Sequence, residues 1–241
     1  MSGNAYHEMS RLCKGLPRSY KIKQRISELN KLWNIFPTPN GTCGVQQSLE
    51  ERLRVRISEL RKTAPSDAAF RKNRTVNVKL SGDGTNIGKR LHVVNFTFTL
   101  LEVGSLAYSC EGNHTLAIFK DEEKYEPLRN ALEDIRNDVE RIPTITVDGI
   151  TYNITYYLGG DWKFLAMVTG IDSTSSEYAC IWCKCPSSER YDMHKEWSIM
   201  DSSLRARTIE ENIELCGLSR HSKSKKYNAS NPPLFPSIPC H

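Results

Sequence analysis

Two aspartates stand directly after strand-like stretches, and each has glycine neighbours. Asp83 follows the alternating stretch 74–80, and Asp161 follows the stretch 150–158 after a Gly-Gly pair. Two carboxylates that lie close together repel unless a cation stands between them, and hard oxygen ligands favour Mg²⁺ or Mn²⁺. Asp83 and Asp161 are therefore the candidate catalytic residues and metal ligands of a site for two-metal phosphodiester chemistry. The alternative is two turn aspartates, with Asp161 capping the next helix.

A third acid normally completes a site of this kind, and the candidates lie in one helical run, 208–215. They are Glu210, Glu211 and Glu214. Thr208 with Glu211 has the spacing of a capping box, which predicts that Glu211 serves its own helix. The sequence therefore leaves the third catalytic position without an assignment.

Cys180 and Cys183 form a Cys-x-x-Cys pair, which is half of a zinc site. We expect this pair to bind Zn²⁺ together with two further ligands. The remaining candidates are Cys185, His194, Cys216, His221, Cys240 and His241. The alternatives are free core cysteines or a redox pair, although the strand-then-helix setting of redox pairs is missing. The eight cysteines of the chain follow an N-terminus without an apolar signal segment, which favours thiols or metal over disulfides.

Positive charge is concentrated in the first third of the chain. Residues 1–80 contain 16 Lys and Arg against 6 Asp and Glu, whereas residues 81–241 contain 17 against 22. Apolar residues recur at helical spacing in 18–36 and in 46–62, with basic residues between them. Such helices predict contacts with the DNA backbone. A solvated basic face or a helical interaction element would give the same pattern. The candidate DNA-binding residues are Arg52, Arg54, Arg56, Arg61 and Lys62.

The rest of the chain alternates between strand and helix patterns. Strands are expected over 74–80, 91–102, 115–119, 145–147 and 150–158, with a turn at 148–149, and helices over 122–141 and after Asp161. This order is typical of an α/β fold with a ribonuclease-H-like mixed sheet and flanking helices, in which the first and fourth strands of the core are parallel neighbours. We predict a small basic helical region at 1–70 and the core domain at 71–241. No run of 18 apolar residues occurs, so no membrane partner is expected.

Three motifs give the chain a family resemblance from Leu80 to His241. An acid in the context x-x-Asp-Gly follows a strand at Asp83, an acid after glycines precedes a helix at Asp161, and a tyrosine-led Cys-x-x-Cys begins at Tyr178. In this order they resemble the catalytic domains of the V(D)J recombinase large subunit and of the Transib transposases. The stretches DGTNIGKR and YYLGGDWKFLA also resemble transposon-derived reading frames from aquatic animals.

The resemblance implies a DDE-type transposase or recombinase that cleaves and transfers DNA strands in the nucleus. It implies Asp83 and Asp161 as Mg²⁺ or Mn²⁺ ligands and Cys180 and Cys183 as zinc ligands. It also implies DNA as a partner and a second copy of the chain as another, in a homodimer. In the family, the third catalytic glutamate and two zinc-binding histidines come later than Cys183, beyond the end of this sequence. The expectation is therefore a truncated, inactive copy. The alternatives are a non-catalytic DNA-binding or interaction module and a structural zinc module.

Overall fold

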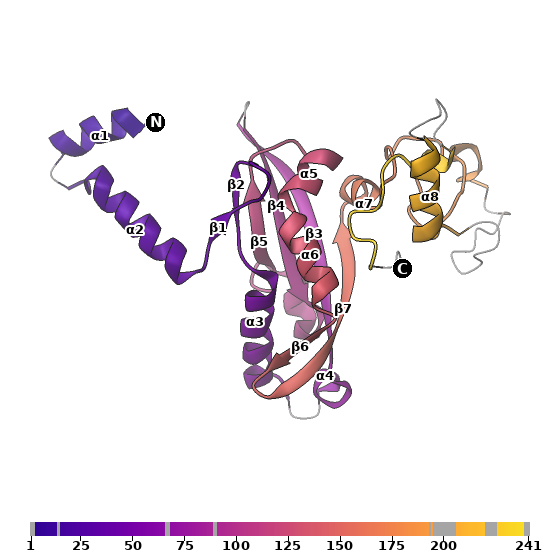
Figure 1. The fold of residues 1–241 in the computed structure, drawn as a ribbon, viewed down its shortest axis with the longest axis horizontal. Coiled ribbons are helices and arrows are strands. Elements are labelled where there is room, and N and C mark those ends of the chain that lie inside the picture. Colours follow the sequence, from indigo (N-terminus) through magenta and orange to yellow (C-terminus); the bar gives the residue numbers. More distant parts are fainter. Residues whose placement is uncertain are drawn as a thin grey trace.

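The computed structural model of this protein is built around one seven-stranded mixed sheet (Figure 1). The structure describes residues 3–13, 15–65, 68–88, 91–192, 194, 206–219 and 226–238. The strands lie in the order β1 (Phe36–Pro37), β2 (Gly44–Gln46), β5 (His114–Phe119), β4 (Leu91–Leu100), β3 (Thr75–Ile87), β7 (Ile150–Gly160) and β6 (Thr144–Val147). β3 and β7 are parallel, and the other neighbouring pairs are antiparallel. The predictions of an α/β fold with a mixed sheet and of a parallel first and fourth core strand are confirmed.

Alternation along β3 gives the sheet a buried face and an open face. Val76, Val78 and Leu80 are fully buried, whereas the intervening Lys79 and Ser81 are only half-buried. Successive residues of a strand point to opposite faces, so the odd-numbered residues of β3 belong to the open face. Figure 1 shows α5 (Tyr125–Ala131) and α6 (Glu133–Arg141) lying along the sheet.

The helix α3 (Leu49–Thr63) packs against this sheet instead of standing apart from it. It buries one apolar side, formed by Leu49, Leu53, Ile57 and Leu60. Ser48 caps its N-terminus by accepting a hydrogen bond from the backbone N–H of Glu51 at 3.4 Å. The residues of β1, β2 and α3 lie before the predicted boundary at residue 70 and nevertheless contribute to the sheet and its core. The division into 1–70 and 71–241 stays a prediction.

The predicted helix over 122–141 is two shorter helices. The first, α5, begins at Tyr125, and a break at Leu132 separates it from α6. Pro127 explains the late start, because a proline inside a helix clashes with the carbonyl four residues earlier, whereas the first turn tolerates it. The turn predicted at Asp148 and Gly149 is confirmed. Both residues have positive φ, 48° and 76°, as a two-residue turn of type I′ requires.

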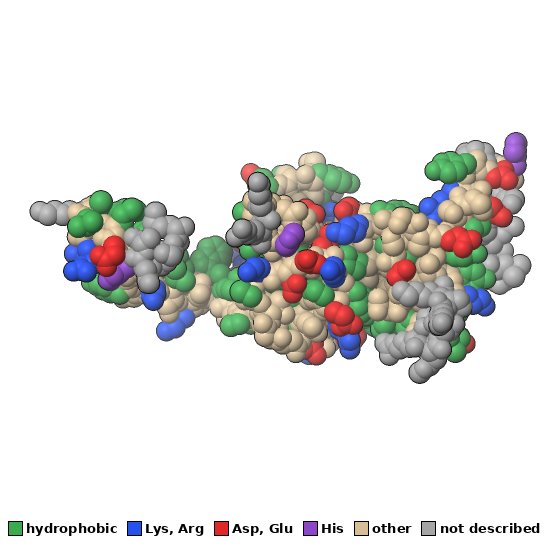
Figure 2. All heavy atoms as spheres, turned by 90° about the horizontal axis from the view of Figure 1, so that it is seen from above, with side chains coloured by type: hydrophobic (Ala, Val, Ile, Leu, Met, Phe, Trp, Pro, Cys, Tyr) green, Lys and Arg blue, Asp and Glu red, His purple; other side chains and the backbone are tan. Residues whose placement is uncertain are grey.

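The first two helices form an arm that stands away from the sheet (Figure 1). They are α1 (Gly3–Leu12) and α2 (Ser19–Leu32), and α2 has no buried residue. Its basic side chains Lys21, Lys23, Arg25 and Lys31 are exposed, and Figure 2 shows Lys and Arg side chains on this arm. The prediction of a helix near 18–36 is confirmed, although it ends early because the chain enters β1 at Phe36.

The remaining elements are short helices. They are α4 (Ala69–Asn73), η1 (Leu101–Tyr108), α7 (Trp162–Val168), η2 (Ser187–Glu189), α8 (Ile209–Ser219) and η3 (Lys226–Asn228). Figure 1 shows α8 to the side of the sheet, beyond α7. The segment 226–238 is tied into the core, because Phe235 stacks on Phe96 with ring centroids 6.0 Å apart and Arg136 Nε donates to the carbonyl of Leu234 at 2.7 Å. Across the described ranges, no helix has the length and apolar character needed to cross a membrane.

Candidate functional site

The two predicted catalytic acids follow directly after paired residues of two neighbouring strands. The register of the parallel pair β3–β7 sets Gly82 opposite Gly160, and Asp83 and Asp161 are the next residues of the two segments. Neighbouring strands lie about 4.8 Å apart, so the backbones of the two acids start close together. Both aspartates are exposed. The structure therefore brings the backbones of this predicted pair together where β7 ends. The predicted end of the first core strand before Asp83 is wrong, because β3 continues through Asp83 to Ile87 in its pairing with β4.

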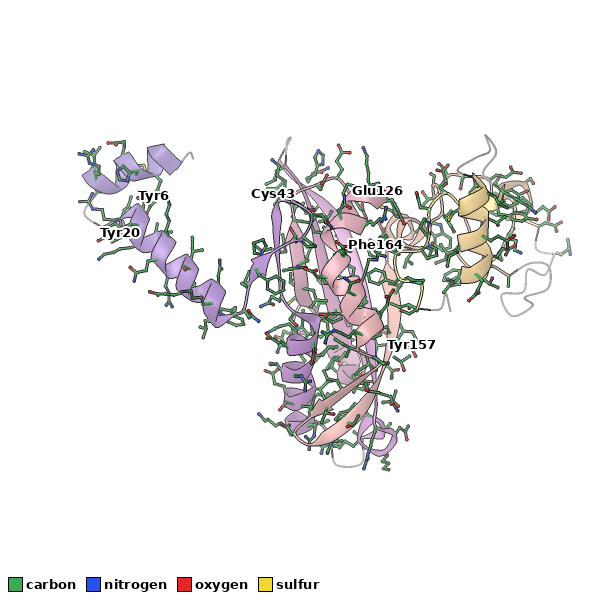
Figure 3. The ribbon with its side chains drawn as sticks, viewed as in Figure 1. Tyr6, Tyr20, Cys43, Glu126, Tyr157 and Phe164 are labelled. Atoms are coloured by element: carbon green, nitrogen blue, oxygen red, sulfur yellow. The ribbon has the colours of Figure 1, made fainter. Side chains whose placement is uncertain are left out.

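Gly82 and Gly160 leave room for the ring that fixes α7 against the sheet. An added Cβ at Gly82 would lie 2.2 Å from Cε2 of Phe164, and one at Gly160 would lie 2.7 Å from Cδ1 of the same ring. Phe164 is fully buried and is labelled at this junction in Figure 3. The glycines before the two acids are thus needed for helix packing, which holds the end of the sheet and the start of α7 together.

One oxygen of Asp161 already has a structural task. Asp161 is the N-cap of α7, and its Oδ1 accepts a hydrogen bond from the backbone N–H of Phe164 at 2.7 Å. The capping role proposed as the alternative for this residue is therefore present. A carboxylate has a second oxygen and several lone pairs, so capping leaves Asp161 able to contribute one oxygen to a cation.

Asp83 lies on the open face of β3, opposite Asn95 of β4. The Oδ1 atom of Asn95 is buried and has no hydrogen-bond partner among the described residues. Two exposed carboxylates next to an unpaired amide oxygen form a donor set that suits a hard divalent cation, which usually keeps several waters. Within the described ranges, no three His, Cys, Asp or Glu side chains are grouped so as to hold a metal. The residues fit Mg²⁺ or Mn²⁺ through the two carboxylates of Asp83 and Asp161, and no third acidic ligand among the described residues joins them.

Of the three glutamates that were candidates for the third acid, Glu211 is held in a contact of its own. Thr208 Oγ1 accepts a hydrogen bond from the backbone N–H of Glu211 at 3.1 Å, so the Thr208 half of the predicted capping box is confirmed. The carboxylate of Glu211 pairs with Lys184 at 2.8 Å. Glu210 and Glu214 are exposed.

An ion pair between a buried glutamate and an exposed lysine lies beside the two aspartates. The side chain of Glu123 is only 7% exposed and binds Lys163 Nζ at 2.5 Å. It packs against Gly84, where an added Cβ would lie 2.8 Å from Cβ of Glu123. Hollows of about 440 and 310 Å³ meet at this ion pair, but neither is lined by Asp83 or Asp161. The two hollows thus lie next to the aspartates and not over them, and the aspartates are brought together by the register of β3 and β7.

Cys180 and Cys183 lie together in a loop that Arg207 organises. Burial raises the pKa of the Cys183 thiol to about 11, and a hydrogen bond with the Cys180 thiol adds to the effect. Arg207 is buried, and its guanidinium donates to the carbonyls of Cys180 at 2.7 Å and Cys183 at 3.1 Å. It also donates to the carbonyls of Tyr178 and Tyr227 at 2.8 and 2.7 Å. No sequence motif signals this role of Arg207.

The thiol pair fits one half of a zinc site. Cys185 and Cys216 are buried, and the Cys216 thiol donates to the carbonyl of Ile213 at 3.1 Å. His194 is exposed. The other suggested ligands, His221, Cys240 and His241, lie outside the described residues. Zinc binding by Cys180 and Cys183, with partners that complete the set, stays a prediction.

Three of the five predicted DNA-binding residues on α3 make ion pairs within the chain. Arg54 pairs with Glu50 at 2.7 Å, Arg56 with Glu59 at 2.6 Å and Arg61 with Asp148 at 3.0 Å. Arg52 is half-buried, and burial, followed by the charge of Arg56, lowers its pKa. Much of the positive charge of α3 is thus balanced locally, whereas the basic residues of α2 project into solvent.

No protein-family model matches this chain, and no curated protein matches it significantly. The resemblance to transposases and recombinases therefore stays a prediction that rests on the motifs at Asp83, Asp161 and Tyr178.

Proposed function

We propose that this chain is a ribonuclease-H-like domain of the DDE transposase and recombinase type. The supporting observation is the register of β3 and β7, which makes Asp83 and Asp161 the next residues after the paired glycines Gly82 and Gly160. The strand order β5-β4-β3-β7 with one parallel pair agrees with such a core. The partner in this proposal is nuclear DNA, which the exposed basic residues of the arm would contact through phosphates.

Asp83 and Asp161 would hold Mg²⁺ or Mn²⁺ in this proposal. Such ions supply activation of water or of a 3′-hydroxyl and stabilisation of the leaving oxygen at a phosphodiester. The chain itself would position the ion through the pairing of β3 with the end of β7, and α7 would orient Asp161 through the cap to Phe164. Cys180 and Cys183 would hold Zn²⁺ as a structural ion, and a homodimer belongs to the same proposal. A third acid is lacking in the described donor set, so we expect slow or undetectable cleavage.

The second candidate is a non-catalytic DNA-binding or interaction module that keeps the same scaffold. Asp161 favours it, because one of its carboxylate oxygens is already used as a helix cap. In this candidate the acids have no catalytic role, and DNA binding depends on salt but not on divalent ions.

Nicking of supercoiled DNA in Mn²⁺ tests the proposed function. The catalytic proposal predicts that any nicking by the wild type is slow and is lost in both Asp83→Asn and Asp161→Asn. Asp161→Asn should change thermal stability little, because asparagine is also a good N-cap. Nicking that survives in both variants would refute it. Absence of nicking together with salt-dependent, Mn²⁺-independent DNA binding would support the second candidate.

The DNA-binding surface is tested by two charge variants of equal size. Arg52, Arg54 and Arg56 are replaced by Ala in one, and Lys21, Lys23 and Arg25 in the other. Each phosphate contact that is lost reduces the slope of log affinity against log salt by about 0.9. The prediction of DNA contacts by α3 requires a smaller slope in the first variant. A change confined to the second variant would move the contacts to the arm.

A further inference from the structure

Asn95 on β4 has an amide oxygen without a partner beside the proposed metal ligand Asp83. The two residues are directly opposite in the antiparallel pair β3–β4. Residues opposed in this way project from the same face of the sheet, with Cβ atoms about 4.5–5.5 Å apart. The Oδ1 atom of Asn95 is buried and accepts no hydrogen bond from the described residues. Other buried side-chain atoms of the described residues also lack a partner, among them Glu102 Oε2 and Glu123 Oε1. The Asn95 oxygen is distinguished by its place directly opposite the proposed metal ligand Asp83, and an unpaired buried acceptor there calls for a partner.

The surroundings of Asn95 supply no hydrogen-bond donor to its oxygen in the described structure. Its neighbour on the β5 side is Ile118, which is apolar. Another asparagine on this face, Asn77, is fully engaged. Its Nδ2 donates to Glu102 at 2.8 Å, and its Oδ1 accepts from the hydroxyl of Tyr157 at 3.3 Å. Asn95 therefore differs from a comparable residue on the same face by its unsatisfied oxygen.

We infer that Asn95 is a third oxygen ligand of the divalent cation bound by Asp83 and Asp161. The inference rests on the proposed function, because it adds to the same site. The strands β4, β3 and β7 are adjacent in the sheet, so Asp83 has an oxygen donor on each side, Asn95 on β4 and Asp161 after β7. Carbonyl oxygens suit Mg²⁺ and Mn²⁺. The amide adds a donor without adding a further negative charge to two carboxylates that already repel each other.

Mn²⁺ binding to the full chain tests this inference, with calorimetry for the dissociation constant and the Mn²⁺ electron-spin spectrum for coordination. Asn95→Leu removes the oxygen and keeps a strand-compatible side chain of similar size. We expect it to weaken Mn²⁺ binding at least about tenfold, in the range seen when supports of metal sites are lost. The melting temperature without metal should be unchanged or higher, because an unpaired buried acceptor has been removed. A merely structural role predicts the reverse, a lower melting temperature with unchanged Mn²⁺ affinity.

Asn95→Asp separates a ligand from a residue that only donates a hydrogen bond to Asp83. A ligand role predicts equal or tighter Mn²⁺ binding, because a carboxylate oxygen replaces the amide oxygen. A donor role predicts weaker binding, because the donor becomes a repelling charge. Thr97→Asp is the matched control, since Thr97 lies two residues further along β4 on the same face, opposite Ser81. A similar gain in Mn²⁺ affinity in Asn95→Asp and Thr97→Asp would show that any added negative charge on this face has the same effect. That result would overturn the inference.

The outcomes also separate this inference from the proposed function. Binding by the wild type that is lost in Asp83→Asn but unchanged in both Asn95 variants would refute the role of Asn95 alone. Absence of Mn²⁺ binding in the wild type would refute the proposed metal site and, with it, this inference.

Discussion

Replacing Gly82 by alanine should damage the junction that brings the two aspartates together. The added Cβ would lie 2.2, 2.7 and 2.8 Å from three carbon atoms of the Phe164 ring. The ring cannot easily move away, because it is fully buried and contacts Phe96 with centroids 6.3 Å apart. Forcing extra atoms into a packed core typically costs about 1–3 kcal/mol. We expect Gly82→Ala to lower the free energy of unfolding by that amount.

A double-mutant cycle with Phe164→Leu identifies the cause. Leucine lacks the ring atoms that meet the new Cβ, so Gly82→Ala should cost at least about 1 kcal/mol less in the Phe164→Leu background than in the wild type. Urea unfolding with linear extrapolation measures each corner of the cycle. Gly217→Ala is the control, because a Cβ added there would meet no atom within 4 Å and alanine favours the helix α8 by about 1 kcal/mol. An equal cost of Gly82→Ala in both backgrounds would refute the packing argument.

Three further predictions concern other parts of the fold. Burial, followed by the charges of Arg56 and Arg52, lowers the pKa of His114 from 6.5 to about 4, so the neutral ring stabilises the fold above pH 6.5 and this contribution is lost as the pH falls toward 4. The full pKa shift corresponds to at most about 3.4 kcal/mol, which partial solvent screening reduces to about 1–2 kcal/mol. The difference in unfolding free energy between the wild type and His114→Gln should change by this amount between pH 6.5 and about 4. A difference that stays constant with pH would contradict the prediction. Gly149→Ala should cost about 1 kcal/mol in urea unfolding, because its φ of 76° is unfavourable for alanine although the surrounding space is open; an unchanged midpoint would argue against the type I′ turn. Arg207→Met should destabilise the chain by at least about 3 kcal/mol, because it leaves several carbonyls without their donor, and it should speed the reaction of the Cys-x-x-Cys thiols with a disulfide reagent; unchanged thiol rates would remove Arg207 from the organisation of that loop.

The parts of the fold that depend on local chemistry were predictable from the sequence. Alternation predicted the first part of β3, up to Leu80, but not its continuation to Ile87. The Asp148–Gly149 pair predicted the turn between β6 and β7, because a type I′ turn needs residues that tolerate positive φ. The N-cap role of Asp161 followed from its position before an apolar helical pattern. The late start of α5 has an equally local cause, since Pro127 disfavours a helix that begins at Glu122.

The parts that depend on distant pairing were not predictable in the same way. β1 and β2 lie among prolines and glycines that indicate turns, and they become strands because β2 pairs with β5 about 70 residues later. The position of Asn95 opposite Asp83 depends on the register of the β3–β4 hairpin, which alternation alone does not fix. Arg207 binds carbonyls from two distant segments, and no motif of the sequence predicts such contacts.

The most direct test of the central proposal is Mn²⁺ binding by calorimetry to the wild type and to the Asp83→Asn/Asp161→Asn double variant. The proposal predicts binding by the wild type that disappears in the double variant, while the melting temperature changes little because asparagine can still cap α7. Equal binding by both proteins, or no binding by the wild type, would contradict a cation site between Asp83 of β3 and Asp161 at the end of β7.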